Sequence, residues 1–195
     1  MKEENNNSSR FIVPILPLLS VFVLFIFAVL KRQDTVDIIK SSLIVLLLSS
    51  TIVFYINMQK NRYLMNKKSS KIFFTLSYIA SICLAMQPYS PNVYVFWLLG
   101  PLLIAMLIDD KLALMTCLNI TILLSINSGL RPEQTIHLLI VGLLMITLSN
   151  YLKEKSSFVY ASLINISTNI TLAYVIHHFL FDSTYDYIKS SLVII

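Results

Sequence analysis

Charged side chains are scarce in this 195-residue chain, where aspartate, glutamate, lysine and arginine together make up 13% of the residues. A soluble globular domain carries about 25%. Glycine occurs only three times and cysteine twice, so neither a glycine-rich phosphate loop nor a disulfide framework is expected. Hydrophobic residues, in contrast, make up 56%. This composition excludes a soluble enzyme, a secreted disulfide-rich domain and a nucleic-acid-binding domain, and it predicts an integral membrane protein.

The hydrophobic residues gather in long uncharged runs. A helix that spans a bilayer needs roughly 20 mostly apolar residues. Because the runs are continuous and do not alternate with polar residues, they favour helices over the strands of a barrel. We predict an all-α fold, a polytopic membrane helix bundle of about seven transmembrane helices, with spans at residues 11–30, 41–58, 72–87, 93–108, 112–127, 136–152 and 158–181.

The bundle is expected to occupy residues 11–181. Residues 1–10 are rich in asparagine and serine and predict a disordered cytoplasmic tail. Residues 182–195 predict a short C-terminal tail or the start of a further helix. The first run is interpreted as a retained helix, with Pro14 and Pro17 near its start, where proline is best tolerated. Gly100 and Pro101 are expected to interrupt the fourth span and to kink it.

The basic residues predict the orientation of the chain. With the N-terminus in the cytoplasm, ten lysines and arginines lie in cytoplasmic segments and five outside, which accounts for all 15. The densest group lies in the cytoplasmic segment 59–71, which could also attract anionic lipid headgroups. Four of its residues are candidate contacts for a protein partner: Lys60, Arg62, Lys67 and Lys68.

Two adjacent carboxylates, Asp109 and Asp110, precede Lys111 between the fourth and fifth spans. A charge at the centre of a bilayer costs roughly 2.5–3.5 kcal/mol, so this triplet is expected at a turn. The simpler interpretation is a plain cytoplasmic turn. The functional interpretation is a second contact for the protein partner.

Asparagines lie inside two of the spans. Asn165 and Asn169 are four residues apart and share one face of a helix. We predict that they line a ligand-binding cleft together with Asn119. The simpler interpretation is hydrogen bonding between helices.

His177 and His178 lie near the outer end of the last span, and Asp182 follows His178 at a spacing of four. Both histidines are candidate ligand contacts, and the simpler interpretation is a polar pair at the membrane interface. His137, near the outer end of the sixth span, can approach them only if the last two spans pack side by side. No metal-ligand spacing such as HExxH is present, so we expect no metal, no cofactor and no catalytic residue.

Residues 90–126 resemble the membrane region of the seven-transmembrane receptors with an intracellular HD hydrolase domain. A Ser-Pro turn, a proline-containing helix that ends in aspartate and a Lys-Leu-Ala start of the next helix carry the resemblance; they stand here as Ser90-Pro91, Pro101, Asp109 and Lys111-Leu112-Ala113. The resemblance extends over about residues 41–181. It implies a membrane bundle in the bacterial cytoplasmic membrane and a cytoplasmic segment 59–71.

Members of that family carry a large extracellular domain after the first helix and a cytoplasmic HD domain that hydrolyses cyclic di-AMP. The resemblance leads us to expect a membrane module without either domain, and no catalytic residue can be carried over from it.

Three functions are weighed. We predict a non-catalytic signalling or scaffold module, or a membrane subunit of a larger complex, that contacts the lipid bilayer and a protein partner in or beneath the membrane. The alternative is a membrane subunit of a transporter that binds a small solute, similar to the substrate-binding components of energy-coupling-factor systems. An intramembrane hydrolase that uses His177 or His178 has only their proximity in its favour.

Overall fold

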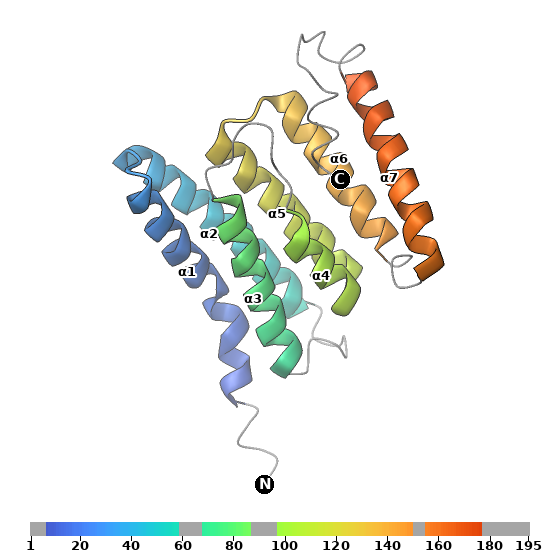
Figure 1. Cartoon of the computed structure of the whole chain (residues 1–195). Helices are drawn as coiled ribbons and strands as arrows, with labels where there is room; N and C mark the ends of the chain where they lie inside the picture. The colour runs from blue at the N-terminus through green and yellow to red at the C-terminus, as the bar shows by residue number, and fades with distance from the viewer. Residues whose placement is uncertain (1–6, 59–67, 87–96, 150–154, 177–195) are drawn as a thin grey trace.

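The computed structural model describes residues 7–58, 68–86, 97–149 and 155–176. In this part of the chain all regular structure is helical, and seven helices follow one another (Figure 1): α1 (Asn7–Leu30), α2 (Thr35–Met58), α3 (Lys68–Ala85), α4 (Leu99–Leu107), α5 (Asp110–Ser128), α6 (Pro132–Leu148) and α7 (Lys155–Val175). The all-α bundle of about seven helices is therefore confirmed.

The helices run alternately up and down in Figure 1, and α5 lies at the centre. It packs against α2, α3, α4 and α6, whereas α1 packs against α2 and α3. The last helix, α7, lies at the edge of the bundle against α6. We call the end that carries the α1–α2 and α5–α6 turns the upper end, and the end that carries the α4–α5 turn the lower end.

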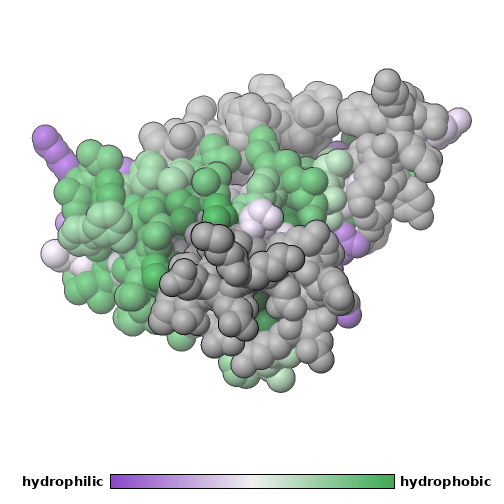
Figure 2. All heavy atoms as spheres, turned by 90° about the horizontal axis from the view of Figure 1, so that it is seen from below, coloured by the Kyte–Doolittle hydropathy of each residue, from purple (hydrophilic) through white to green (hydrophobic). Residues whose placement is uncertain are grey.

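Three helices are long and apolar enough to cross a membrane, namely α1 from Val13 to Leu30, α2 and α5. Large hydrophobic side chains are exposed on the outside of the bundle, for example Leu18, Phe54 and Leu76. Seen from the lower end, much of the described surface is hydrophobic (Figure 2). A soluble monomer rarely exposes so large an apolar surface, and lipid tails cover it at no cost.

Two helices begin elsewhere than the sequence suggests. Helix α1 begins at Asn7, so that Pro14 and Pro17 lie inside it and not in its first turn. The described part of α4 begins at Leu99, which places Pro101 in the first turn instead of at a kink in the middle. The missing N–H of Pro101 is harmless there, because the first four N–H groups of a helix have no partner within it.

The turns are set by single residues. Asp109 precedes α5 in an extended conformation. Gly129 ends α5 with a φ of 60°, a left-handed conformation that favours glycine. Pro132 is the first residue of α6, and the Gln134 side chain accepts a hydrogen bond of 3.1 Å from the Arg131 backbone N–H. The predicted turn at Asp109 and Asp110 is thus confirmed.

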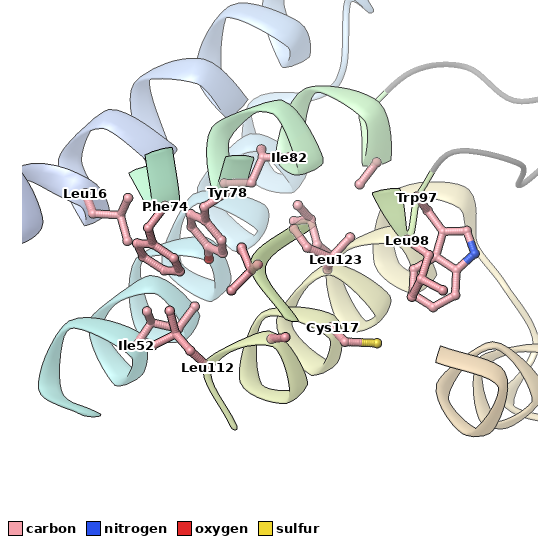
Figure 3. Close-up of a cluster of buried hydrophobic side chains, with 14 of the residues drawn as sticks. Leu16, Ile52, Phe74, Tyr78, Ile82, Trp97, Leu98, Leu112, Cys117 and Leu123 are labelled. Atoms are coloured by element: carbon pink, nitrogen blue, oxygen red, sulfur yellow. The ribbon is translucent and has the colours of Figure 1, made fainter. Parts of the chain in front are cut away.

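One continuous apolar core joins α1 to α6. Leu16, Ile52 and Phe74 lie on three different helices and are fully buried in it (Figure 3). Phe74 stacks on Tyr78 with the ring centres 6.1 Å apart. Among the described side chains, Ala173 of α7 and Ile176, which follows it, belong to a separate small cluster with Leu172.

Candidate ligand site between α6 and α7

Most buried hydroxyl groups of the bundle are satisfied within their own helix. Ser20 donates to the Leu16 carbonyl at 2.7 Å, and Thr121 donates to the Cys117 carbonyl at 2.8 Å. Ser49, Ser81 and Thr116 form the same kind of bond across one turn. Such side chains complete their hydrogen bonding without another helix, water or ligand.

Asn119 is also satisfied, by a neighbouring helix. Its Nδ2 donates to the Leu48 carbonyl of α2 at 2.8 Å, and its side chain is hydrogen-bonded to Tyr78 of α3. The amide therefore joins α2, α3 and α5, as expected of an asparagine that holds helices together in lipid.

At the upper end, Asn127 joins three other parts of the bundle. Its Nδ2 donates to the Ala85 carbonyl at the end of α3 at 3.0 Å, and its Oδ1 accepts a bond of 3.3 Å from Lys31 Nζ. Lys31 lies in the α1–α2 turn, outside the helices, and partial burial lowers its pKa. Its charge lies close to the C-terminus of α3, where the helix dipole favours a cation.

Helix α6 has two buried faces. A Cβ atom on Gly142 would lie 2.5 Å from Cys117 Sγ and 2.7 Å from Trp97 Cη2, so this face is pressed against α5 and the residues before α4. At about 100° per residue, His137 is turned about 140° away from Gly142, and Glu133 lies one turn above His137. Glu133 and His137 therefore share the other face, which lies toward α7.

The facing stripe of α7 is polar in its middle. Asn165 and Asn169 are buried, with exposed fractions of 5% and 1%, and are followed one turn later by Ala173. Asn169 Nδ2 donates to the backbone oxygen and to Oδ1 of Asn165, at 2.9 and 3.0 Å. These bonds use the donors of Asn169, and within the described part of the chain its Oδ1 accepts no hydrogen bond of good geometry.

His137 is the residue of α6 beside Asn169. Its exposed fraction is 6%, and its ring interacts with the Asn169 side chain, although no hydrogen bond of good geometry joins its nitrogens to another described residue. Glu133 is buried to 7% exposure, and no ion pair to it occurs among the described residues. We define the α6–α7 joint as Glu133, His137, Asn165 and Asn169. The side chains of His137 and Asn169 interact across it, so the joint provides a polar link between α6 and α7.

The comparison with known families follows the architecture. A family model described as 7TM receptor with intracellular HD hydrolase matches residues 35–195, well over half of the chain. The chain belongs to this family. The membership confirms the predicted resemblance, and the matched region is the membrane part of the 7TM receptor family. No curated protein and no solved structure matches the chain significantly.

The ligand residues predicted from the sequence fall into separate places. Asn165 and Asn169 lie together as expected, but the structure does not bring Asn119 to them, because its amide bonds to Leu48 and Tyr78 on the other side of the bundle. His177 and His178 lie outside the described residues.

Of the predicted partner contacts, Asp109 and Asp110 lie at the lower end in the α4–α5 turn, and Lys68 begins α3 at the same end. Lys60, Arg62 and Lys67 lie outside the described residues.

Sequence reasoning missed Glu133, and it considered His137 only as a neighbour of His177. A signal was present, because Glu133 and His137 are four residues apart and share one face of a mostly apolar helix. Ionisable residues in a membrane helix are rare and face the bundle interior.

Proposed function

We propose that this member of the 7TM receptor family is a non-catalytic signalling module, in which α7 changes its position against a fixed body of six helices. The single observation that carries the proposal is the separation of α7 from the continuous core. Helices α1 to α6 share one apolar cluster, whereas α7 is buried through two asparagines, Ala173 and Ile176.

The energetics favour α7 as the movable element. Displacing a core helix such as α5 would break contacts with four neighbours. Displacing α7 loosens one interface, because of the described helices only α6 packs closely against it. In lipid the attraction between helices comes from close packing and hydrogen bonds, so the helix with fewest of both moves most easily. Shifts of about 1–2 Å by one helix are a common means of switching.

The lower end is the proposed contact for a protein partner. Asp109 and Asp110 lie there, and α2 ends and α3 begins there, so that the basic segment between them starts and finishes at this end. A partner in or beneath the membrane would meet Asp109, Asp110 and the start of α3 at this end. The proposal places the chain in the bacterial cytoplasmic membrane with its N-terminus in the cytoplasm, in agreement with the distribution of basic residues.

The alternative is a solute-binding subunit of a transporter, and one observation favours it. The buried polar residues of the α6–α7 joint suit a bound small molecule as well as they suit a switch. The two functions differ in what accompanies the chain, since a transporter subunit requires paired ATPases.

Affinity purification from native membranes in mild detergent, followed by mass spectrometry of proteins and metabolites, separates the two functions. We expect a protein partner in stoichiometric amount, and we expect its recovery to fall in the double variant Asp109→Asn/Asp110→Asn. The matched control is Asp34→Asn/Asp37→Asn, which removes two exposed carboxylates at the upper end. Recovery of ATPase subunits would favour transport, and recovery of no stoichiometric partner would overturn the signalling module.

A further inference from the structure

We propose that the α6–α7 joint is a proton-controlled switch, in which a neutral His137 holds α7 and a protonated His137 pairs with Glu133 and releases α7. This inference rests on the proposed function, because it names the signal that would move α7. The geometry of the joint carries it, since one ring has a polar neighbour on α7 and an acidic neighbour on its own helix.

The two titratable side chains of the joint lie one turn apart on the same face of α6. Glu133 has an exposed fraction of 7% and His137 of 6%, so both are buried. Ionisable residues inside a membrane helix are rare and mark proton relays and other functional sites. Glu133 lies in the first turn of α6, at the upper end of the bundle, and His137 lies about one turn deeper. A proton that enters from the upper end therefore reaches Glu133 first.

The contacts of His137 in the structure suit a neutral ring. The ring interacts with the Asn169 side chain of α7. No ion pair joins it to Glu133, and both residues are described. A neutral imidazole can be buried against an amide at little cost, whereas a buried cation is costly unless an opposite charge lies beside it. In this state the ring is part of the link between α6 and α7.

The gain of a proton reverses the preference of the ring. Asn169 is neutral, and its Nδ2 already donates to Asn165. The carboxylate of Glu133 offers the protonated ring a charge-assisted hydrogen bond, which is stronger than a bond to a neutral amide. Side chains of a helix lean toward its N-terminus, so the ring of His137 can reach Glu133 without a change in the backbone. A ring that pairs with Glu133 turns away from Asn169, and α7 loses its polar link to α6.

The other charged and titratable groups near α6 lie away from this ring. Helix α4 contains none, and near the start of α6 helix α5 presents Ser125, whose hydroxyl oxygen lies 2.6 Å from that of Thr135. The remaining groups on the described helices around α6 are exposed, lie at the lower end or face Gly142. They are the exposed Arg131, Tyr160 and Tyr174, the lower-end Asp110, Lys111 and Lys155, and Cys117 against Gly142.

The test follows the distance between α5 and α7 as the pH changes. The full chain with Cys83→Ala and Cys117→Ala carries spin labels at the exposed positions Ile126 and Thr171, in nanodiscs of phosphatidylcholine. Histidine ordinarily changes its charge between about pH 5 and about pH 8, so we expect the displaced population of α7 to grow as the pH falls through this range. Because one proton is taken up per chain, the ratio of displaced to docked α7 should rise at most about tenfold per pH unit. A displaced population that stays constant or falls with acid would overturn the switch.

Two variants assign the response to the joint. His137→Gln keeps an amide that can bond to Asn169 but cannot be protonated in this range, so the pH response should disappear. Glu133→Gln removes the acidic partner of the protonated ring, so the displacement should require about tenfold more protons, a shift of about one pH unit. Asp34→Asn is the matched control for Glu133→Gln, because it removes an exposed carboxylate at the same end of the bundle. An equal shift in Asp34→Asn, or none in Glu133→Gln, would refute the role of Glu133.

The chain has three histidines, and His177 and His178 lie outside the described residues. The double variant His177→Gln/His178→Gln should keep the pH response. A response that survives His137→Gln, or one that disappears in the double variant, would refute the assignment to His137.

A second pair of labels, at Leu43 and Ile126, lies within the body of α1 to α6 and checks that each variant is folded. Its distance distribution should be the same at every pH, and a change with acid would overturn the switch by showing that the whole bundle loosens. A broad distribution between Ile126 and Thr171 that ignores pH would end the proton switch and leave the movement of α7 standing. Distributions that are equally narrow for both pairs at every pH would contradict the switch and the movement together.

Discussion

Gly100 occupies a position where an added methyl group has no room. A Cβ atom there would collide with Ser81 Oγ and would lie 2.7 Å from the backbone oxygen of Ser77. Both residues belong to α3, so α3 and α4 approach each other closely at Gly100. We expect Gly100→Ala to destabilise the bundle.

The magnitude follows from which atoms can move. Ser81 Oγ can rotate away only by giving up its hydrogen bond of 2.8 Å to the Ser77 carbonyl, which is worth about 1 kcal/mol. The Ser77 oxygen belongs to the backbone and cannot rotate, so α3 and α4 must separate, and overpacking of this kind costs about 1–3 kcal/mol. Replacing glycine by alanine in a helix returns at most about 1 kcal/mol. The net loss in unfolding free energy is therefore about 2 kcal/mol.

Unfolding in mixed micelles, followed by the fluorescence of Trp97, measures this loss. Ser81→Gly should recover part of it in a double-mutant cycle, because it removes the Oγ collision but leaves the Ser77 oxygen in place. Gly129→Ala is an informative comparison, since its Cβ would meet nothing within 4 Å and its cost, about 1–2 kcal/mol, comes from the positive φ alone. Wild-type stability for Gly100→Ala, or no coupling with Ser81→Gly, would refute the close approach of α3 and α4.

Four further changes probe the polar contacts. Asn119→Leu should lower the unfolding free energy by about 0.5–1.5 kcal/mol, because its hydrogen bonds to Leu48 and Tyr78 are lost. The control Asn57→Leu makes the same change at an exposed position of α2 and should leave the unfolding free energy unchanged. Equal effects of the two variants would contradict the contacts of Asn119. Asn127→Ala should lose about 1 kcal/mol, because the Ala85 carbonyl and Lys31 both lose a partner. Partial burial lowers the pKa of Lys31 below 10.5, so the folded state releases this proton at a lower pH than the unfolded state. The stability of the wild type relative to Lys31→Gln should therefore rise as the pH increases through the lowered pKa. A fall in relative stability would contradict the burial of Lys31. Asn169→Leu should lower the unfolding free energy by about 1 kcal/mol, because the buried Asn165 Oδ1 loses its donor, and wild-type stability would contradict the bonds between Asn165 and Asn169.

The sequence predicts the architecture of this protein well, for a simple physical reason. Lipid requires each spanning segment to satisfy its own backbone, so long apolar runs become helices wherever they occur. The number of helices, the turn at Asp109 and the pairing of Asn165 with Asn169 all follow from local pattern. The family resemblance carried by the Ser-Pro, Pro101 and Lys-Leu-Ala motifs is confirmed by the family match.

Relations between helices are harder to predict from the sequence. Asn119 and the pair on α7 look alike as polar residues in apolar helices, yet Asn119 faces α2 and the pair faces α6. Which face of a helix meets which neighbour depends on packing, and for α6 the small residue Gly142 decides it. Gly142 lets Trp97 and Cys117 approach one face of α6, which leaves Glu133 and His137 for α7.

The central claim is that α7 moves against a body formed by α1 to α6. Spin labels on a chain with Cys83→Ala and Cys117→Ala test it directly by pulsed electron resonance. The first pair of labels, at Ile126 of α5 and Thr171 of α7, measures the distance from the body to α7. The second pair, at Leu43 of α2 and Ile126, measures a distance within the body. All three positions are exposed. We expect a broader distance distribution for the first pair than for the second. Equally narrow distributions for the two pairs would contradict the movement of α7.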